Sequence, residues 1–112
     1  MARYLVTGEF VDAGPLLPPQ QVVQLVEQVL LPSIEALAKL EDQKRIVAGG
    51  VIAGARAGAF IVEVASNAEL NRLLMELPMW GLIKWTTTPL LSFRERAADE
   101  KAAIERVKAM MR

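Results

Sequence analysis

The chain has 112 residues, of which 53% are apolar, and its 13 basic and 13 acidic side chains give a formal net charge of zero. This length suits one domain with a modest core, and the balanced charge argues against nucleic acid or a membrane surface as a partner. Cysteine and histidine are both absent, which excludes disulfides and thiolate sites and removes the usual general base, metal ligand and proximal haem ligand. We therefore expect no metal and no other cofactor.

Targeting and membrane-spanning signals are not evident in the sequence. The first ten residues, MARYLVTGEF, lack the pattern of a signal peptide. No apolar run reaches the roughly 18 residues that a membrane-spanning helix needs. We expect a cytoplasmic protein.

The first part of the chain predicts one strand and one long helix. Residues 3–12 are rich in β-branched and aromatic side chains, which favours a strand. The sequence AGPLLPP over residues 13–19 ends it, because glycine and proline do not continue a strand. Apolar side chains then recur every three or four residues from 20 to 40, which predicts an amphipathic helix. Pro32 lies inside this pattern, so we expect a kink or a short restart near Leu31.

The middle of the chain predicts a hairpin followed by a second helix. Strands over residues 44–54 and 58–66 are joined by the turn sequence ARAG. Ser66 and Glu69 have the spacing of a capping box, which predicts that a helix begins at the next residue after Ser66. Pro78 ends that helix, because proline lacks a backbone N–H and disfavours helical backbone in the residue before it.

The last part of the chain predicts a strand and a charged helix. Residues 81–91 read as the fourth strand, since aromatic and β-branched side chains follow a glycine. Residues 93–112 read as a third helix with mixed charges and an apolar stripe too narrow for a core helix. That stripe could lie across a partner subunit or across the open end of a pocket, and we expect the partner subunit. It consists of Phe93, Ala97, Ile104, Val107 and Met111.

This order of elements predicts an α+β fold. Two split βαβ units give a ferredoxin-like βαββαβ antiparallel sheet, with both crossover helices on one face and an extra C-terminal helix. The strands are apolar on both faces, so the face opposite the helices also needs cover. A second copy packed sheet to sheet, as an obligate homodimer of the α+β barrel type, supplies it. We expect one domain in which residues 1–91 form the barrel unit and residues 92–112 a helical extension.

The stretch RAGAFIVEVASNAELNRLLMELPMW, residues 56–80, resembles the muconolactone isomerase family of the dimeric α+β barrel superfamily. The shared features are an apolar strand that ends in an acid, a short helix, and the junction Leu77-Pro78-Met79-Trp80. The resemblance covers about residues 4–91. It implies a homodimer that can assemble into larger rings. It also implies a small pocket where cofactor-free proton shifts occur on lactones or related oxygenated molecules.

The resemblance implies the scaffold rather than muconolactone as the substrate. Members of the family that isomerise carry basic and imidazole side chains on the first two strands. The positions that we pair with those are Leu5, Val47 and Ala48, which are apolar or small.

Three charged residues in otherwise apolar strands are the candidate catalytic residues, Glu9, Glu63 and Lys84. The topology places them on three adjacent strands. A carboxylate among them would act as the general base, and Lys84 would stabilise a developing enolate. The alternative is structural: Glu9 and Lys84 pair between strands or across the dimer interface, and Glu63 lies near a strand end in water.

The candidate substrate-binding residues are neighbours of these charges or aromatic side chains. Thr7 shares a face with Glu9, and Thr86 shares one with Lys84. Trp80 and Trp85 suit a pocket mouth or a subunit contact, because a buried indole N–H needs a partner. Tyr4 is a further candidate, although its position among core-facing aliphatic residues favours core packing. Gly49 and Gly50 indicate a β-bulge or a close approach of the backbone.

These observations favour a cofactor-independent enzyme that isomerises, or transfers a proton on, a small apolar oxygenated molecule. Two other functions stay open, a cofactor-free monooxygenase on the same scaffold and a non-catalytic ligand-binding or assembly module. An isomerase needs a carboxylate that faces a cavity, whereas an assembly module needs no cavity larger than a few waters.

Overall fold

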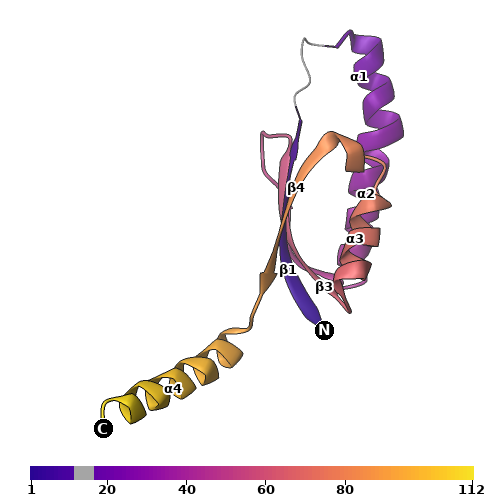
Figure 1. Cartoon of the computed structure of the whole chain (residues 1–112). Helices are drawn as coiled ribbons and strands as arrows, with labels where there is room; N and C mark the ends of the chain where they lie inside the picture. The colour runs from indigo at the N-terminus through magenta and orange to yellow at the C-terminus, as the bar shows by residue number, and fades with distance from the viewer. Residues whose placement is uncertain (12–16) are drawn as a thin grey trace.

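The computed structural model describes residues 1–11 and 17–112, and its sheet has the predicted ferredoxin-like topology. Four antiparallel strands lie in the order β2-β3-β1-β4. The helices that precede β2 and β4 cover one face of this sheet (Figure 1). The elements are β1 (Ala2–Phe10), α1 (Pro19–Leu25), η1 (Val26–Leu30), α2 (Leu31–Asp42), β2 (Ile46–Val51), β3 (Ala57–Val64), α3 (Asn67–Met75), η2 (Trp80–Leu82), β4 (Ile83–Leu90) and α4 (Phe93–Met110). The predicted fold class is confirmed, whereas the predicted end of the first strand at residue 12 and the break over residues 13–16 lie outside the described residues.

The core lies between the sheet and the helices. Alternate residues of a strand point to opposite faces, and the even-numbered residues of β1 and β3 point toward the helices. Val6 and Val62 are fully buried on this face. On the helix side of the core lie leucines of α3 and residues of the segment that follows this helix. The other core residues are Tyr4, Ile46, Phe60, Val64, Leu70, Leu73, Leu74, Leu77 and Met79.

The long first helix changes geometry just before Pro32, as predicted. The α-helix α1 is followed by the π-helical turn η1, and α2 starts at Leu31. Proline has no N–H to donate to the carbonyl four residues earlier, and its ring crowds that carbonyl. A π-helical turn shifts the hydrogen-bond pattern past the proline without ending the helix.

Ser33 connects this irregular helix to the chain between α3 and β4. It is the fully buried polar side chain among the described residues. Its hydroxyl donates to the carbonyl of Val29 at 2.7 Å and accepts the backbone N–H of Met79 at 2.9 Å. Because Met79 is itself buried, its N–H has no access to water if this contact is lost.

Replacing Ser33 with alanine is expected to lower the free energy of unfolding by about 1–3 kcal/mol, since the Met79 N–H is left buried without an acceptor. Urea unfolding followed by circular dichroism measures this change. A loss below about 0.5 kcal/mol, within the usual range for surface substitutions, would contradict the role assigned to the hydroxyl.

Helix α3 begins as the capping-box spacing predicts. Ser66 is extended and its hydroxyl accepts the N–H of Glu69 at 3.2 Å. The Glu69 carboxylate reaches back to the N–H of Ala65 at 2.6 Å and also pairs with Arg45. The helix ends at Met75, two residues before the predicted end, and Pro78 leads into the short 3-10 helix η2. Strand β4 therefore begins at Ile83, two residues later than the pattern suggested.

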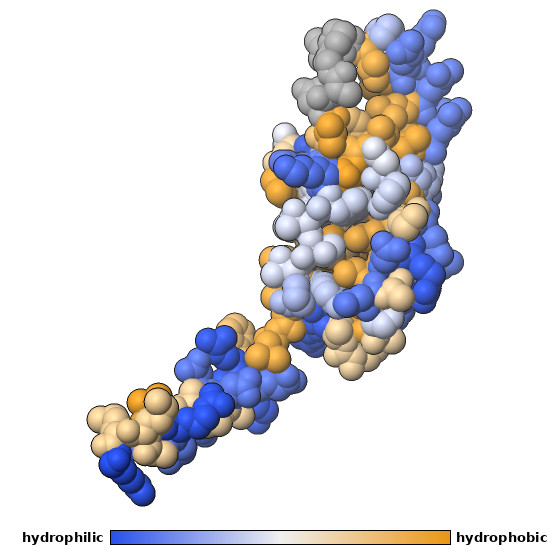
Figure 2. Space-filling view, in the orientation of Figure 1, coloured by the Kyte–Doolittle hydropathy of each residue, from blue (hydrophilic) through white to orange (hydrophobic). Residues whose placement is uncertain are grey.

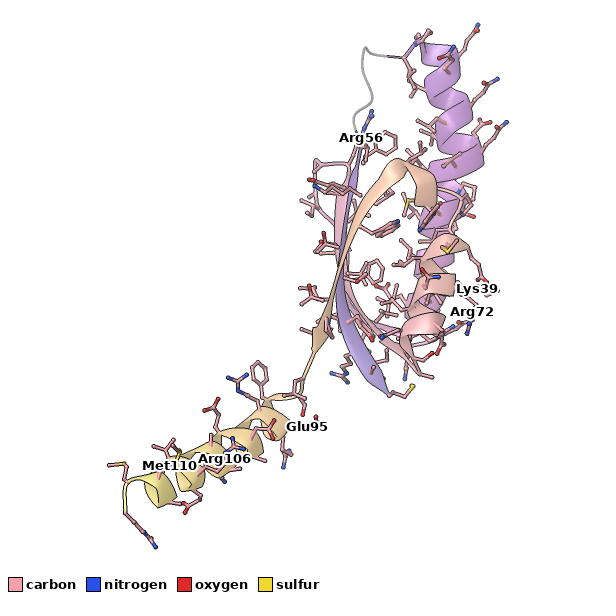
Figure 3. All side chains as sticks on the ribbon, in the orientation of Figure 1. Lys39, Arg56, Arg72, Glu95, Arg106 and Met110 are labelled. Atoms are coloured by element: carbon pink, nitrogen blue, oxygen red, sulfur yellow. The ribbon has the colours of Figure 1, made fainter. Side chains whose placement is uncertain are left out.

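Helix α4 projects away from the rest of the molecule (Figure 1). The radius of gyration is 19.2 Å and the longest dimension is 73 Å, whereas a compact chain of this length has a radius of gyration of about 13 Å. In Figure 3, Glu95, Arg106 and Met110 extend from α4 at a distance from the sheet and its helices. The side chain of Phe93 is 97% exposed at the start of this helix.

The sheet face opposite the helices is open. Leu5 lies between Ile61 and Thr88 on this face, and the next outward residue, Thr7, lies between Ala59 and Thr86. These central residues are uncharged and partly or fully exposed. Within the described residues, none of the helices has the length and apolar character needed to cross a membrane.

Candidate functional site

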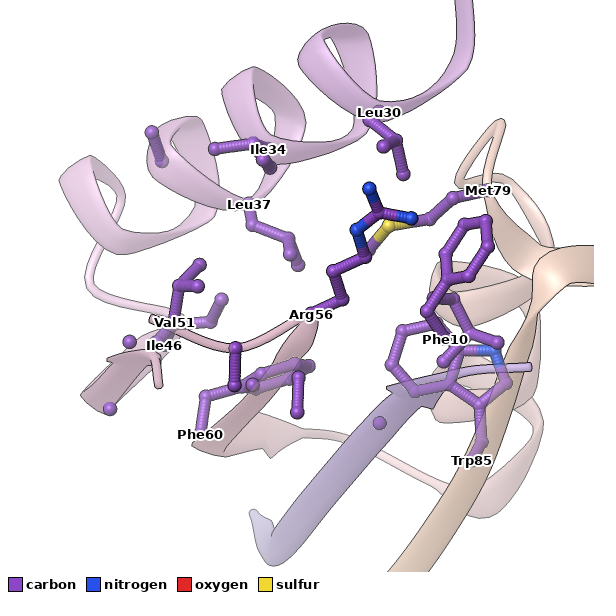
Figure 4. A pocket seen from close by; sticks show the side chains of 18 of the residues that line it. Phe10, Leu30, Ile34, Leu37, Ile46, Val51, Arg56, Phe60, Met79 and Trp85 are labelled. Atoms are coloured by element: carbon purple, nitrogen blue, oxygen red, sulfur yellow. The ribbon is translucent and has the colours of Figure 1, made fainter. Parts of the chain in front are cut away.

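A cavity of about 330 Å³ lies between the helix-facing side of the sheet and α2 (Figure 4). All four strands contribute to its floor, α2 and Leu30 of η1 form its roof, and the turn between β2 and β3 lies at one end. Its walls are almost entirely apolar. The lining side chains include Phe10, Leu30, Ile34, Leu37, Ile46, Val51, Phe60, Met79, Ile83 and Trp85.

Arg56 brings a positive charge to this apolar space. It belongs to the turn between β2 and β3, and its carbonyl accepts the N–H of Phe10 at 2.9 Å, which fixes the turn against the end of β1. The guanidinium carbon lies 5.7 Å from the centroid of the Phe10 ring, within range of a cation–π interaction. Figure 4 shows the Arg56 side chain pointing up from the turn toward Leu30 and Met79. The guanidinium can therefore bind an oxygen of a molecule held in the cavity.

Glu41 is the carboxylate among the described residues that line the cavity. It lies in the last turn of α2, which is closed by an N–H of Lys44 donated to the Glu41 carbonyl at 2.9 Å. Lys44 has a φ of 61°, the left-handed conformation that commonly follows a helix end. Among the described residues, the cavity thus has one acidic and one basic side chain, and both are exposed.

Trp85 forms part of the floor, and Gly8 makes room for it. The indole N–H is buried and has no hydrogen-bond partner among the described residues. A Cβ at Gly8 would lie 2.8 Å from a ring carbon of Trp85 and 2.8 Å from Ile83. Because Gly8 has no side chain, the indole of Trp85 on β4 can lie across β1 at this position. A buried N–H without an acceptor is unusual, and an acceptor on a bound molecule would satisfy it.

Alanine at Gly8 is expected to displace the indole of Trp85 and to lower the free energy of unfolding by about 1–3 kcal/mol through overpacking. In a Trp80→Phe background the fluorescence of Trp85 reports the displacement directly. Alanine at Gly81, where an added Cβ meets no atom within 4 Å, is the control and should leave both quantities unchanged. Equal effects at the two glycines would contradict the packing described for Trp85.

The three candidate catalytic residues from the sequence lie on the opposite face of the sheet from this cavity. Glu9 and Lys84 occupy directly paired positions of β1 and β4. Glu63 lies at the other end of that face, where its carboxylate forms a salt bridge with the guanidinium of Arg3 at 2.5 Å. The structure brings Glu9 and Lys84 together but separates both from Glu63, and none of the three lines the cavity. Their catalytic role stays a prediction.

The five candidate binding residues are distributed over four places. Trp85 lines the cavity. Tyr4 is buried in the core, and its hydroxyl donates to the side-chain carbonyl of Asn67. Thr7 and Thr86 are paired on the open sheet face, and Trp80 is 44% exposed on η2.

Sequence reasoning missed Arg56 and Glu41 as site residues. Arg56 was part of a predicted turn and Glu41 followed the predicted helix, and neither position is a polar residue within an apolar strand. The signal that pointed toward the cavity was the Gly49-Gly50 pair, since both residues line it. The register of β2 against β3 shifts between Ile46 and Ala48, just before this pair, so the predicted bulge is present nearby. No group of three or more acidic side chains suited to a metal ion occurs within the described residues.

Comparison with known families assigns this chain to an enzyme family. The family model described as muconolactone delta-isomerase matches residues 10–108, which is most of the chain. The chain belongs to that family. Its resemblance to muconolactone isomerase, suggested by the stretch over residues 56–80, is thereby confirmed. A comparison with curated proteins found no match to this chain.

Solved structures support the same fold. The crystal structure of muconolactone isomerase is similar with a TM-score of 0.63 and 21% identity, covering 80% of this chain and 88% of that chain. At this identity the likeness shows the shared fold alone. The leucine response regulatory protein LrpA of Mycobacterium tuberculosis and the feast or famine regulatory protein of M. tuberculosis have TM-scores of 0.46 and 21% identity. The matches cover 81% and 82% of this chain but only 51% of each regulator, and they carry no functional argument.

Proposed function

We propose that this protein is a cofactor-independent isomerase that moves a proton on a small apolar oxygenated molecule, such as a lactone or an enol, bound between the sheet and α2. The observation that carries the proposal is the apolar cavity of about 330 Å³ with one carboxylate and one guanidinium at its rim. A single water occupies about 30 Å³ of liquid, so the cavity far exceeds the space of a few waters. Family membership supports the isomerase class.

The proposed reaction needs only a base and a group that stabilises negative charge. The Glu41 carboxylate takes a proton from a carbon beside the carbonyl, and the electron pair of that C–H bond moves onto the carbonyl oxygen as an enolate. The Arg56 guanidinium binds this oxygen and stabilises its charge within the apolar surroundings. In a substrate with a C=C bond beside the deprotonated carbon, the carbonyl re-forms, the C=C bond shifts by one position, and Glu41 returns the proton to the far carbon of that former double bond. The reaction therefore consumes no oxidant, reductant or other co-reactant.

The same proposal includes a homodimer formed through the open sheet face. The uncharged residues at the centre of that face suit a sheet-to-sheet interface, in which side chains of two sheets pack about 10 Å apart. In this arrangement Glu9 and Lys84 lie at one end of the interface and the Arg3–Glu63 pair at the other. We propose that these charges orient the two copies, rather than act on the bound molecule.

The test is proton exchange in heavy water. A panel of lactones and enolisable ketones is incubated with the protein in D₂O, and NMR follows deuterium incorporation at the carbon beside the carbonyl. The proposal expects protein-dependent deuteration of at least one compound without oxygen uptake. Oxygen consumption measured with an electrode on phenolic compounds would instead favour the monooxygenase, and binding without any exchange would favour a ligand-binding module.

A further inference from the structure

Within the described part of the chain, the apolar stripe of α4 has no partner. Among its members, Phe93 is 97% exposed, Ile104 51% and Val107 55%. An isolated helix of 18 residues is only marginally stable in water, and helices in proteins depend mainly on the burial of an apolar face. A helix that projects from the molecule with such a stripe therefore needs a surface to pack on.

A second exposed apolar surface runs along the first helix (α1, η1 and α2), beside the cavity, as far as the described residues show. Val23, Val26, Leu31 and Ile34 are each between 40% and 52% exposed. Ile34 also lines the cavity, as does the exposed Val51 at the end of β2. Figure 2 shows hydrophobic side chains on the surface in the upper part of the molecule, where α1 lies. This surface and the stripe of α4 are both long, narrow and apolar, which is the geometry of two helices packed along their length.

The charges around the two surfaces are opposite. Residues 17–42 contain four carboxylates and one lysine, so this segment has a net charge of −3. Residues 93–112 contain six basic and four acidic side chains, a net charge of +2. The whole chain is neutral, so this separation of charge is a local property of the two helical segments. Opposite charge on facing surfaces favours their association and sets its orientation.

The direction of α4 shows which copy it can reach. The cavity lies toward the end of the sheet where Phe10 pairs with Ile83, whereas α4 follows the opposite end, where Arg3 pairs with Leu90. In Figure 1, α4 also extends to the side of the sheet that the other helices leave open. Its own cavity is therefore out of reach. When a second copy packs on the open face with its strands antiparallel to those of the first copy, the cavity of the second copy lies beside α4 of the first.

The length of α4 suits this path. Its 18 residues span about 27 Å at 1.5 Å per residue. Facing sheets lie about 10 Å apart, and a helix packs about 10 Å from its neighbour, so crossing the partner's sheet and helix layers takes about 20 Å. We propose that α4 of each copy packs along the first helix of the other copy and covers the mouth of its cavity. This inference rests on the dimer and the ligand cavity proposed above.

Cross-linking tests the contact itself. The chain has no cysteine, so a variant with Ile104→Cys and Val26→Cys carries one thiol on each surface. Mild oxidation is expected to give a covalent dimer on a non-reducing gel. The matched control combines Val26→Cys with Ala102→Cys, which lies on the opposite side of α4. Equal cross-linking of the two variants, or none in either, would overturn the proposal.

Dye binding tests whether the contact covers the cavity. Anilinonaphthalene sulfonate, which has an apolar body and one negative charge, serves as the probe. The variant Ile104→Glu, Val107→Glu is expected to release the dye about tenfold faster than the control Ala102→Glu, Ala109→Glu, which adds the same charge on the other side of α4. Equal release rates with normal dye affinity would contradict the proposal that α4 covers the cavity, and would leave the proposed ligand cavity unaffected. Cross-linking without any dye binding would support the contact between the helices and contradict the proposed ligand site.

Discussion

Gly49→Ala is expected to lower the free energy of unfolding by at least about 3 kcal/mol, the largest effect on stability that we foresee for a single methyl group. Gly49 has a φ of 123°, a conformation that residues with a side chain rarely adopt. An added Cβ would lie 2.3 Å from the carbonyl oxygen of Ala59 and 2.4 Å from the Cα of Phe60. Both are backbone atoms of β3, so relief requires the two strands to separate. Urea unfolding of the purified variant measures the change.

Gly50→Ala is the matched control, because it makes the same change one residue further along β2. An added Cβ at Gly50 meets no atom within 4 Å. The free energy of unfolding of this variant should stay within about 0.5 kcal/mol of the natural protein. If the two alanine variants were equally stable, the close approach of β2 and β3 described here would be wrong.

Glu41→Gln is expected to lower the rate of proton exchange by about 10²–10⁴-fold, the range that a positioned general base contributes. Glutamine keeps the size and polarity of the side chain but cannot accept a proton at neutral pH. Binding of the compound should change little, because the apolar walls and Arg56 are unaltered. NMR in D₂O measures the rate, and the same titration gives the affinity.

Glu35→Gln provides the control for this variant. Glu35 lies on the same helix and is exposed, but it does not line the cavity. Its replacement should leave the exchange rate within about twofold of the natural protein, since it removes the same charge from α2 away from the site. An unchanged rate in Glu41→Gln would exclude Glu41 as the base. The base would then be sought among the carboxylates of the open sheet face.

The fold was accessible from the sequence because its signals are local. Strand and helix periodicity gave the element order, and that order restricts the topology to very few arrangements. Pro32 predicted the irregular turn, and Ser66 with Glu69 predicted the start of α3. Boundaries were less accurate, as at the start of β4, because tertiary contacts such as the Ser33–Met79 hydrogen bond hold η2 in place.

The cavity was not accessible in the same way, because it depends on which face of the sheet each residue occupies. The pattern correctly indicated that Thr7 shares a face with Glu9, yet it does not state which face the helices cover. Glu41 and Arg56 line the same cavity because it extends from α2 to the β2–β3 turn. A tertiary arrangement of this kind leaves no periodic pattern in the sequence.

The most direct test of the site compares two cationic side chains on opposite faces of the sheet. The dissociation constant of anilinonaphthalene sulfonate is measured by fluorescence for the natural protein, for Arg56→Gln and for Lys84→Gln. Loss of a hydrogen bond to a charged group costs about 1.5–3 kcal/mol, so Arg56→Gln should weaken binding by about tenfold or more. Lys84→Gln should leave the constant unchanged, because Lys84 lies on the open face. Weaker binding in Lys84→Gln with no effect in Arg56→Gln would place the ligand on the open face and contradict the account.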